Sequence, residues 1–241
     1  MATYYTLHVF DSEKYFKSVL PKMKTDKIYL SKYMETDAFK LFTYRYDRIK
    51  KTTIDEFQEF LKNLSIDGQT YSGDFQSLSI PYGFYKLIEI IIFSECAIFS
   101  PYFHLGKNAV ENKLKFAVKN TLAEEITNKL SNCGDYSIFG YESFGIYNWL
   151  TKDDVELLYL DLDKIIPRNE IDDYSRVLKI MITEAYRDKL GLICCKEPIY
   201  GYHCHLKNDS ANLQRFKAFS NQKYFVEIDC SRMQLPLDLN N

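Results

Sequence analysis

Apolar positions are densest between Ile80 and Pro101. Pro81 suits the first turn of a helix, where a missing backbone N–H has no consequence, and Pro101 blocks continuation at the other end. Between the two prolines apolar residues occupy nearly every helical face, interrupted by three charged residues, Lys86, Glu89 and Glu95. A helix that is apolar almost all round is buried on several sides. The pattern therefore predicts a central helix over residues 80–101, around which the other elements pack.

Further segments repeat apolar residues at the spacing of helices with one buried face. Thr53 opens one of them, with Glu56 three residues later as in a capping box, and Thr151 opens another with Asp154 in the same position. The pattern predicts helices between Asp11 and Pro21, from Thr53 to an end at Asp67-Gly68, and over 108–130, 151–166, 172–190 and 213–219, with Gly191 as the C-cap of the fifth.

Three segments lack Gly and Pro and favour strands: the first and last are rich in β-branched and aromatic residues, and the middle one is a short apolar run. They cover residues 3–10, 192–196 and 222–229. No Pro/Gly/Ser-rich linker divides the chain, so residues 1–241 are expected to form a single α+β domain. We predict a mostly helical fold around the central helix, with a small sheet formed by the N- and C-terminal strands.

Residues 134–150 contain three of the nine glycines and the only tryptophan, which indicates a structured loop. Such a loop is expected to bind a partner or ligand through Tyr141, Glu142, Phe144, Tyr147 and Trp149. Within it, Ser143 lies between two glycines, as the nucleophile does in hydrolases. The spacing differs, because two residues rather than one separate the first glycine from Ser143. No catalytic nucleophile is predicted there.

The charge and the aromatic content of the chain bear on whether it binds nucleic acid or protein. The net charge of −2 argues against a dedicated nucleic-acid binder, which needs a basic excess to neutralise phosphates. The charge is segregated, however: residues 1–51 carry 11 Lys/Arg and 6 Asp/Glu, whereas residues 135–197 carry 8 and 13. Basic and aromatic residues alternate over residues 25–51, so base stacking there remains an alternative. The 20 tyrosines suit interfaces, although a low-GC genome would enrich them too.

The six cysteines and the N-terminal sequence indicate the cellular compartment in which the protein is expected. The adjacent Cys194 and Cys195, the chain length and the lack of a secretory signal pattern favour reduced thiols in a cytoplasm. The three charges in the central apolar segment argue against a membrane span. We expect no cofactor and no metal. One spacing leaves a metal site open as an alternative, because His203 and His205 share one face of an extended segment that Cys195 could join, and zinc accepts such ligands.

Three stretches together resemble a family of uncharacterised bacterial proteins. They are the Tyr-x-Leu-x-Val-Phe-Asp pattern of residues 5–11, the Tyr-Gly-Phe-Tyr-x-Leu pattern of residues 82–87, and the Leu-Thr-x-x-Asp-Val pattern of residues 150–155 followed by residues 185–193. These motifs consist of helix caps and core positions. The resemblance implies a cytoplasmic α+β protein and brings no catalytic residues.

The chain shows no cofactor fingerprint, catalytic triad or P-loop, and it is rich in tyrosine with segregated charge. We therefore expect a non-enzymatic intracellular protein that binds another protein, for instance a bacterial immunity-type inhibitor that covers a toxin. A small metal-dependent enzyme that uses Cys195, His203 and His205, and a nucleic-acid binder that uses residues 25–51, are the two alternatives.

Overall fold

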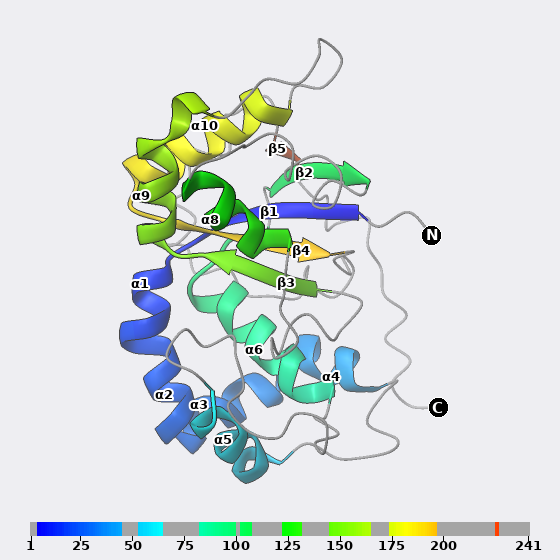
Figure 1. The fold of residues 1–241 in the computed structure, drawn as a ribbon. Coiled ribbons are helices and arrows are strands. Elements are labelled where there is room, and N and C mark those ends of the chain that lie inside the picture. The colour runs from blue at the N-terminus through cyan, green and yellow to red at the C-terminus, as the bar shows by residue number, and fades with distance from the viewer. Residues whose placement is uncertain are drawn as a thin grey trace.

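An antiparallel sheet of five strands divides the molecule into two layers of helices (Figure 1). The computed structural model describes residues 4–44, 53–64, 82–99, 102–107, 122–131, 145–164, 174–196 and 225–226. The strands are β1 (Tyr4–Phe10), β2 (Tyr102–Lys107), β3 (Gly145–Leu150), β4 (Gly191–Lys196) and β5 (Phe225–Val226), in the spatial order β3-β4-β1-β2-β5. The prediction of an α+β fold with a small sheet is confirmed.

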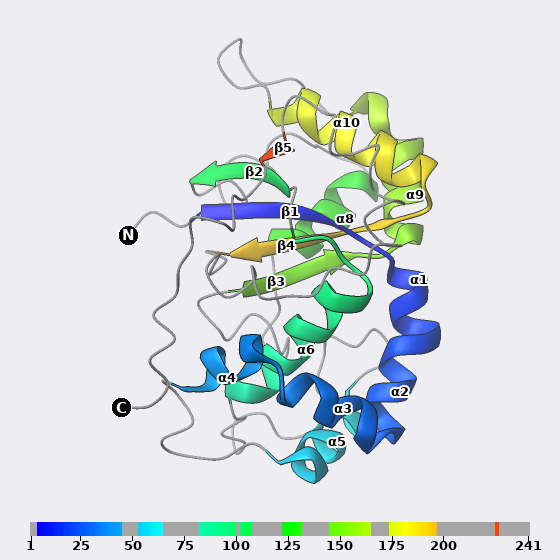
Figure 2. The same cartoon turned by 180° about the vertical axis from the view of Figure 1, so that it is seen from behind.

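The helices occupy both sides of this sheet. Their bounds are α1 (Ser12–Lys14), a π-helical turn (Tyr15–Val19), α2 (Leu20–Thr25), α3 (Lys27–Met34), α4 (Asp37–Tyr44), α5 (Ile54–Lys62), α6 (Tyr82–Glu95), α8 (Leu122–Ser131), α9 (Lys152–Leu160), a 3-10 turn (Leu162–Lys164) and α10 (Tyr174–Arg187). Figures 1 and 2 show α8, α9 and α10 grouped at one end of the molecule, and α2 to α5 at the other end, beyond α6.

The alternation of side chains along each strand separates two hydrophobic cores. In β1, Leu7 and Val9 face α8, α9 and α10, whereas Phe10 faces α6. In β4, Cys194 lies in the core with α9 and α10, and Cys195 lies in the core with α6. The sheet is buried on both faces, which explains why residues 192–195 read as a continuous apolar run.

The central helix predicted from the apolar pattern is α6. Its residues from Leu87 to Phe93 are all buried, and each fully buried aliphatic or aromatic side chain stabilises the fold by about 1.5–3 kcal/mol. The helix ends at Glu95, earlier than Pro101. The chain then passes beside β1, where the Asp11 N–H donates to the Cys96 carbonyl at 2.7 Å and the Ile98 N–H to the Val9 carbonyl at 3.3 Å. These backbone bonds replace those of a longer helix.

Both predicted capping boxes lie at helix starts. The Thr53 side chain accepts from the Glu56 N–H, and the Thr151 side chain accepts from the Asp154 N–H while the Asp154 carboxylate accepts in return from the Thr151 N–H. Pro21 does not end its helix as expected. It lies in the first turn of α2, directly after the π-helical turn, where no N–H is needed from it.

Two strands were missed by the sequence analysis. Residues 145–150, predicted as part of a loop, form β3, which pairs with β4 so that Leu150 lies opposite Leu192. Residues 102–107, treated as a connection, form β2. The prediction that Gly191 caps a helix is also wrong. It begins β4, where a Cβ atom would lie 2.2 Å from the Leu150 carbonyl oxygen, and Lys189 takes the positive φ of 56° at the end of α10.

Other predictions fall partly or wholly outside the described residues. Of the helix predicted over 108–130, the structure describes α8, and of the strand predicted over 222–229 it describes β5. The N- and C-terminal strands belong to one sheet, with β2 between β1 and β5. Ser143 and the helix predicted over 213–219 lie outside the described residues.

Candidate protein-binding surface

The binding residues predicted in the segment 134–150 are placed by the structure only in part. Tyr141, Glu142 and Phe144 lie outside the described residues. Trp149 is 1% exposed, and its ring packs at 5.5 Å from that of Tyr15 in the core on the α6 side. An indole buried in this way fills the core and is out of reach of a partner.

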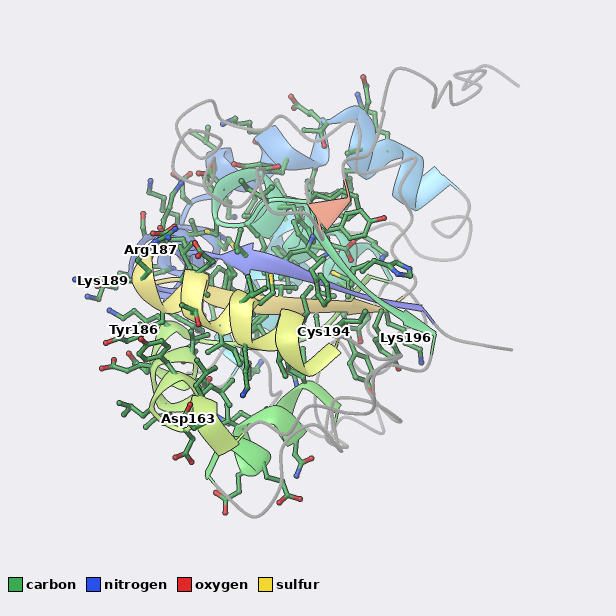
Figure 3. All side chains as sticks on the ribbon, turned by 90° about the horizontal axis from the view of Figure 1, so that it is seen from above. Asp163, Tyr186, Arg187, Lys189, Cys194 and Lys196 are labelled. Carbon is green, nitrogen blue, oxygen red and sulfur yellow. The ribbon has the colours of Figure 1, made fainter. Side chains whose placement is uncertain are left out.

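Tyr147 is the one described member of that set that reaches the surface in part. It is half-buried, and its ring lies edge-on to that of Tyr5 at 5.7 Å. The ammonium group of Lys196 lies 5.7 Å from the centre of the Tyr147 ring. Figure 3 shows Lys196 at the far end of β4 from the C-terminal end of α10. Tyr147 is therefore held by neighbours within the sheet.

The candidate metal ligand Cys195 is buried inside β4. Burial raises the pKa of the Cys195 thiol well above its ordinary value, and the nearby negative charge of Glu89 raises it further. A thiol held protonated is a poor nucleophile and a poor metal ligand. His203 and His205 lie outside the described residues, and within the described ranges no three His, Cys, Asp or Glu side chains come close enough together to hold a metal ion.

Two aromatic side chains of the basic and aromatic segment 25–51 are buried in the core. Tyr33 and Phe39 are both buried, and the Tyr33 hydroxyl donates a hydrogen bond to the carboxylate of Glu95. Base stacking needs a ring face open to solvent. These two rings are therefore not available to a nucleic acid.

A different part of the molecule exposes apolar side chains. The described residues include four large hydrophobic side chains that are exposed: Ile28 (83%), Leu157 (38%), Leu160 (72%) and Tyr186 (37%). Three of the four lie on the adjacent helices α9 and α10, and we call Leu157, Leu160 and Tyr186 the apolar patch. Clustered exposed apolar groups are typical of sites that contact a protein or a membrane.

The position at which α9 begins determines that Leu157 and Leu160 face outward. The Thr151–Asp154 capping box fixes where α9 begins, and Val155 and Leu158 then pack into the core against the sheet. Leu157 and Leu160 are three residues apart on the opposite face, so they share one outer stripe. Lys152 also anchors this end of the helix, because its N–H donates to the Ser12 hydroxyl at 3.0 Å.

Tyr186 joins α10 to this surface by stacking on α9. The rings of Tyr186 and Tyr159 are nearly parallel, at 9° and with 4.0 Å between their centres. Figure 3 shows Tyr186, Arg187 and Lys189 together at the C-terminal end of α10, with Asp163 beside α9. The stacked pair holds the Tyr186 ring in place while leaving part of it exposed.

A cleft of about 440 Å³ lies between the start of α9 and the end of α10. It is lined by six residues, namely Lys152, Asp153, Glu156, Tyr186, Arg187 and Lys189. Two of its cations are paired. The Lys152 ammonium lies 2.8 Å from a Glu13 oxygen, and Arg187 pairs with Glu184 and Asp188.

Sequence reasoning missed this surface, although one signal pointed to it. The inward stripe of the helix was identified from Val155 and Leu158. Leu157 and Leu160 fall off that stripe, and a leucine pair on the outer face of an amphipathic helix needs an explanation. The contribution of Tyr186 could not be found in this way, because it depends on how α10 crosses α9.

No family model matches the chain, and neither does any curated protein or solved structure. The resemblance to the uncharacterised bacterial family therefore stays a prediction. Among the helices that the structure describes, none combines the length and the apolar character needed to cross a bilayer. The case for function consequently depends on the surface itself.

Proposed function

We propose that the chain is a non-enzymatic cytoplasmic protein that binds another protein through the apolar patch on α9 and α10, for instance as a bacterial immunity-type inhibitor that covers a toxin. The observation that carries the proposal is that three of the four large hydrophobic side chains exposed among the described residues, Leu157, Leu160 and Tyr186, lie on two adjacent helices. Burying a leucine or an aromatic side chain contributes about 1.5–3 kcal/mol. A few such side chains supply most of the affinity of a typical interface.

The helical scaffold supports a rigid docking surface. Both leucines project from one helix whose start is capped, and the stacked tyrosines connect that helix to α10. Side chains fixed before binding lose little conformational entropy on association. The free thiols of Cys96, Cys194 and Cys195 agree with a reducing compartment.

Photo-crosslinking in cells tests this proposal. The crosslinking residue p-benzoylphenylalanine replaces Leu160 in one variant and Ile28 in another. Ile28 is a matched control because it is equally apolar and even more exposed, and it lies on α3 at the other end of the molecule (Figures 1 and 2). A discrete crosslinked protein at position 160 that is absent at position 28 is the expected result. No product at position 160, or the same products at both positions, overturns the proposal.

A further inference from the structure

The outer face of α9 carries acidic residues around its exposed leucines. From Asp153 to Asp163 the sequence contains five carboxylates and no Lys or Arg. One of the five, Asp154, is turned inward, where it completes the capping box and pairs with Lys129. Asp153, Glu156 and Asp163 are exposed. The leucines of the apolar patch are therefore surrounded by negative charge.

The described cations nearby neutralise this face only in part. Lys152 is engaged by Glu13, and Arg187 is engaged by Glu184 and Asp188. Lys189 is exposed at the turn after α10. The carboxylates of Glu156 and Asp163 form no ion pair or hydrogen bond with any other residue that the structure describes. The charge left for a partner is mainly negative.

The cleft at the start of α9 does not add to this negative charge. Lys152, Arg187 and Lys189 line it together with Asp153 and Glu156, so its cations outnumber its carboxylates. The negative charge that a partner meets is therefore carried by the outer face of α9, beside Leu157 and Leu160.

We infer that the partner is a protein with a basic surface, which faces the carboxylates on the outer side of α9 and covers Leu157 and Leu160 with apolar residues. This inference rests on the proposed function and names the chemistry of the partner. A second copy of this chain does not fit the same face, because a two-fold interface would place the carboxylates of the two copies against each other.

Charge reversal and salt test the inference on the product that the photo-crosslinker at position 160 captures. Glu156→Lys is expected to lower the crosslinking yield about tenfold, because it replaces attraction to a basic surface with repulsion. Glu35→Lys is the matched control: it makes the same change of charge at the end of α3, and its yield is expected to stay within about twofold. In a cell extract, raising KCl from about 50 mM to about 500 mM should lower the wild-type crosslinking yield about fivefold or more. Unchanged thermal unfolding of both variants shows that the fold is intact.

The outcomes distinguish the proposed protein-binding function from the inferred basic character of the partner. A captured protein whose crosslinking responds to neither Glu156→Lys nor salt overturns the basic partner but keeps the proposed function. An equal loss with Glu35→Lys also overturns it, because the effect is then not local to α9. Absence of any captured protein at position 160 overturns the proposed function and this inference together.

Discussion

Lys86 and Glu89 lie one turn apart on α6 and form an ion pair with 3.1 Å between Nζ and Oε2, although only 1% and 3% of these side chains are exposed. The same oxygen accepts the backbone N–H of Ile146 at 3.4 Å. Gly145, with φ of 105°, brings its backbone so close that an added Cβ would lie 2.1 Å from Oε2. The Lys86–Glu89 pair therefore connects the start of β3 to the central helix α6.

Removing one partner of this ion pair should strongly destabilise the protein. Glu89→Ala leaves the Lys86 ammonium buried without its counter-charge, which lowers the free energy of unfolding by about 3–5 kcal/mol. Urea denaturation followed by circular dichroism measures the change. Glu59→Ala, which removes a carboxylate from the exposed pair with Lys62, should change it by about 0–1 kcal/mol.

Replacing both partners should be far milder than replacing one. The double variant Lys86→Met and Glu89→Leu removes both charges of the pair, so its stability should return to within about 2 kcal/mol of the wild type. A double variant as unstable as Glu89→Ala would show that the ion pair stabilises the fold by more than the free energy that burial of its two charges costs.

A methyl group at position 145 should disturb the same junction. Gly145→Ala is expected to lower the free energy of unfolding by about 1–3 kcal/mol, because alanine is strained at positive φ and its Cβ meets Glu89. The urea midpoint provides the measurement, and Ser31→Ala on α3 serves as a control at a position away from this contact. An alanine variant with the wild-type midpoint would contradict the close approach of Gly145 to Glu89.

Acid should weaken the contact between α1 and α9. Hydrogen bonds and charge from Lys152 and Lys17 lower the pKa of Glu13 from 4.5 to about 2. Because the pKa in the folded state lies below that of the unfolded chain, the pair stabilises the fold at neutral pH, and this contribution is lost as the pH falls from about 4.5 through 2. In Lys152→Met the pKa of Glu13 should rise, which a carboxyl NMR titration detects. An unchanged titration would contradict the pairing.

The described cysteines should be unreactive in the folded protein. Burial raises the pKa of both Cys96 and Cys195 above that of a free thiol, and only the thiolate reacts with alkylating reagents. Iodoacetamide at pH 8 should leave these two residues unmodified in buffer and modify them in urea, as measured by peptide mass spectrometry. Labelling of native Cys195 would support the metal-dependent alternative.

Local signals explain which parts of the fold the sequence could predict. The apolar run of α6, the cap at Thr151 and the apolar segment of β4 each depend on residues close together in the chain. The strand β3 was missed because its glycine and aromatic content is also typical of loops. Only its pairing with β4 distinguishes the two, and that pairing joins residues 42 to 51 positions apart in the chain.

The candidate surface was harder to predict for a related reason. Exposure of Leu160 follows from which face of α9 meets the sheet, and the position of the Tyr186 ring follows from its stacking on Tyr159. Trp149 shows the converse, because a large aromatic side chain that suggests an interface is buried once residues 145–150 form a strand. Residue type alone does not separate an interface from a core.

The affinity of the captured partner tests the central claim most directly. Once the protein crosslinked at position 160 has been purified, isothermal titration calorimetry gives its dissociation constant for the wild type, for the double variant Leu157→Ala and Leu160→Ala, and for Ile28→Ala. If the apolar patch is the docking surface, the double variant binds at least about tenfold more weakly, and Ile28→Ala binds within about twofold of the wild type. A double variant that binds as tightly as the wild type would contradict the account.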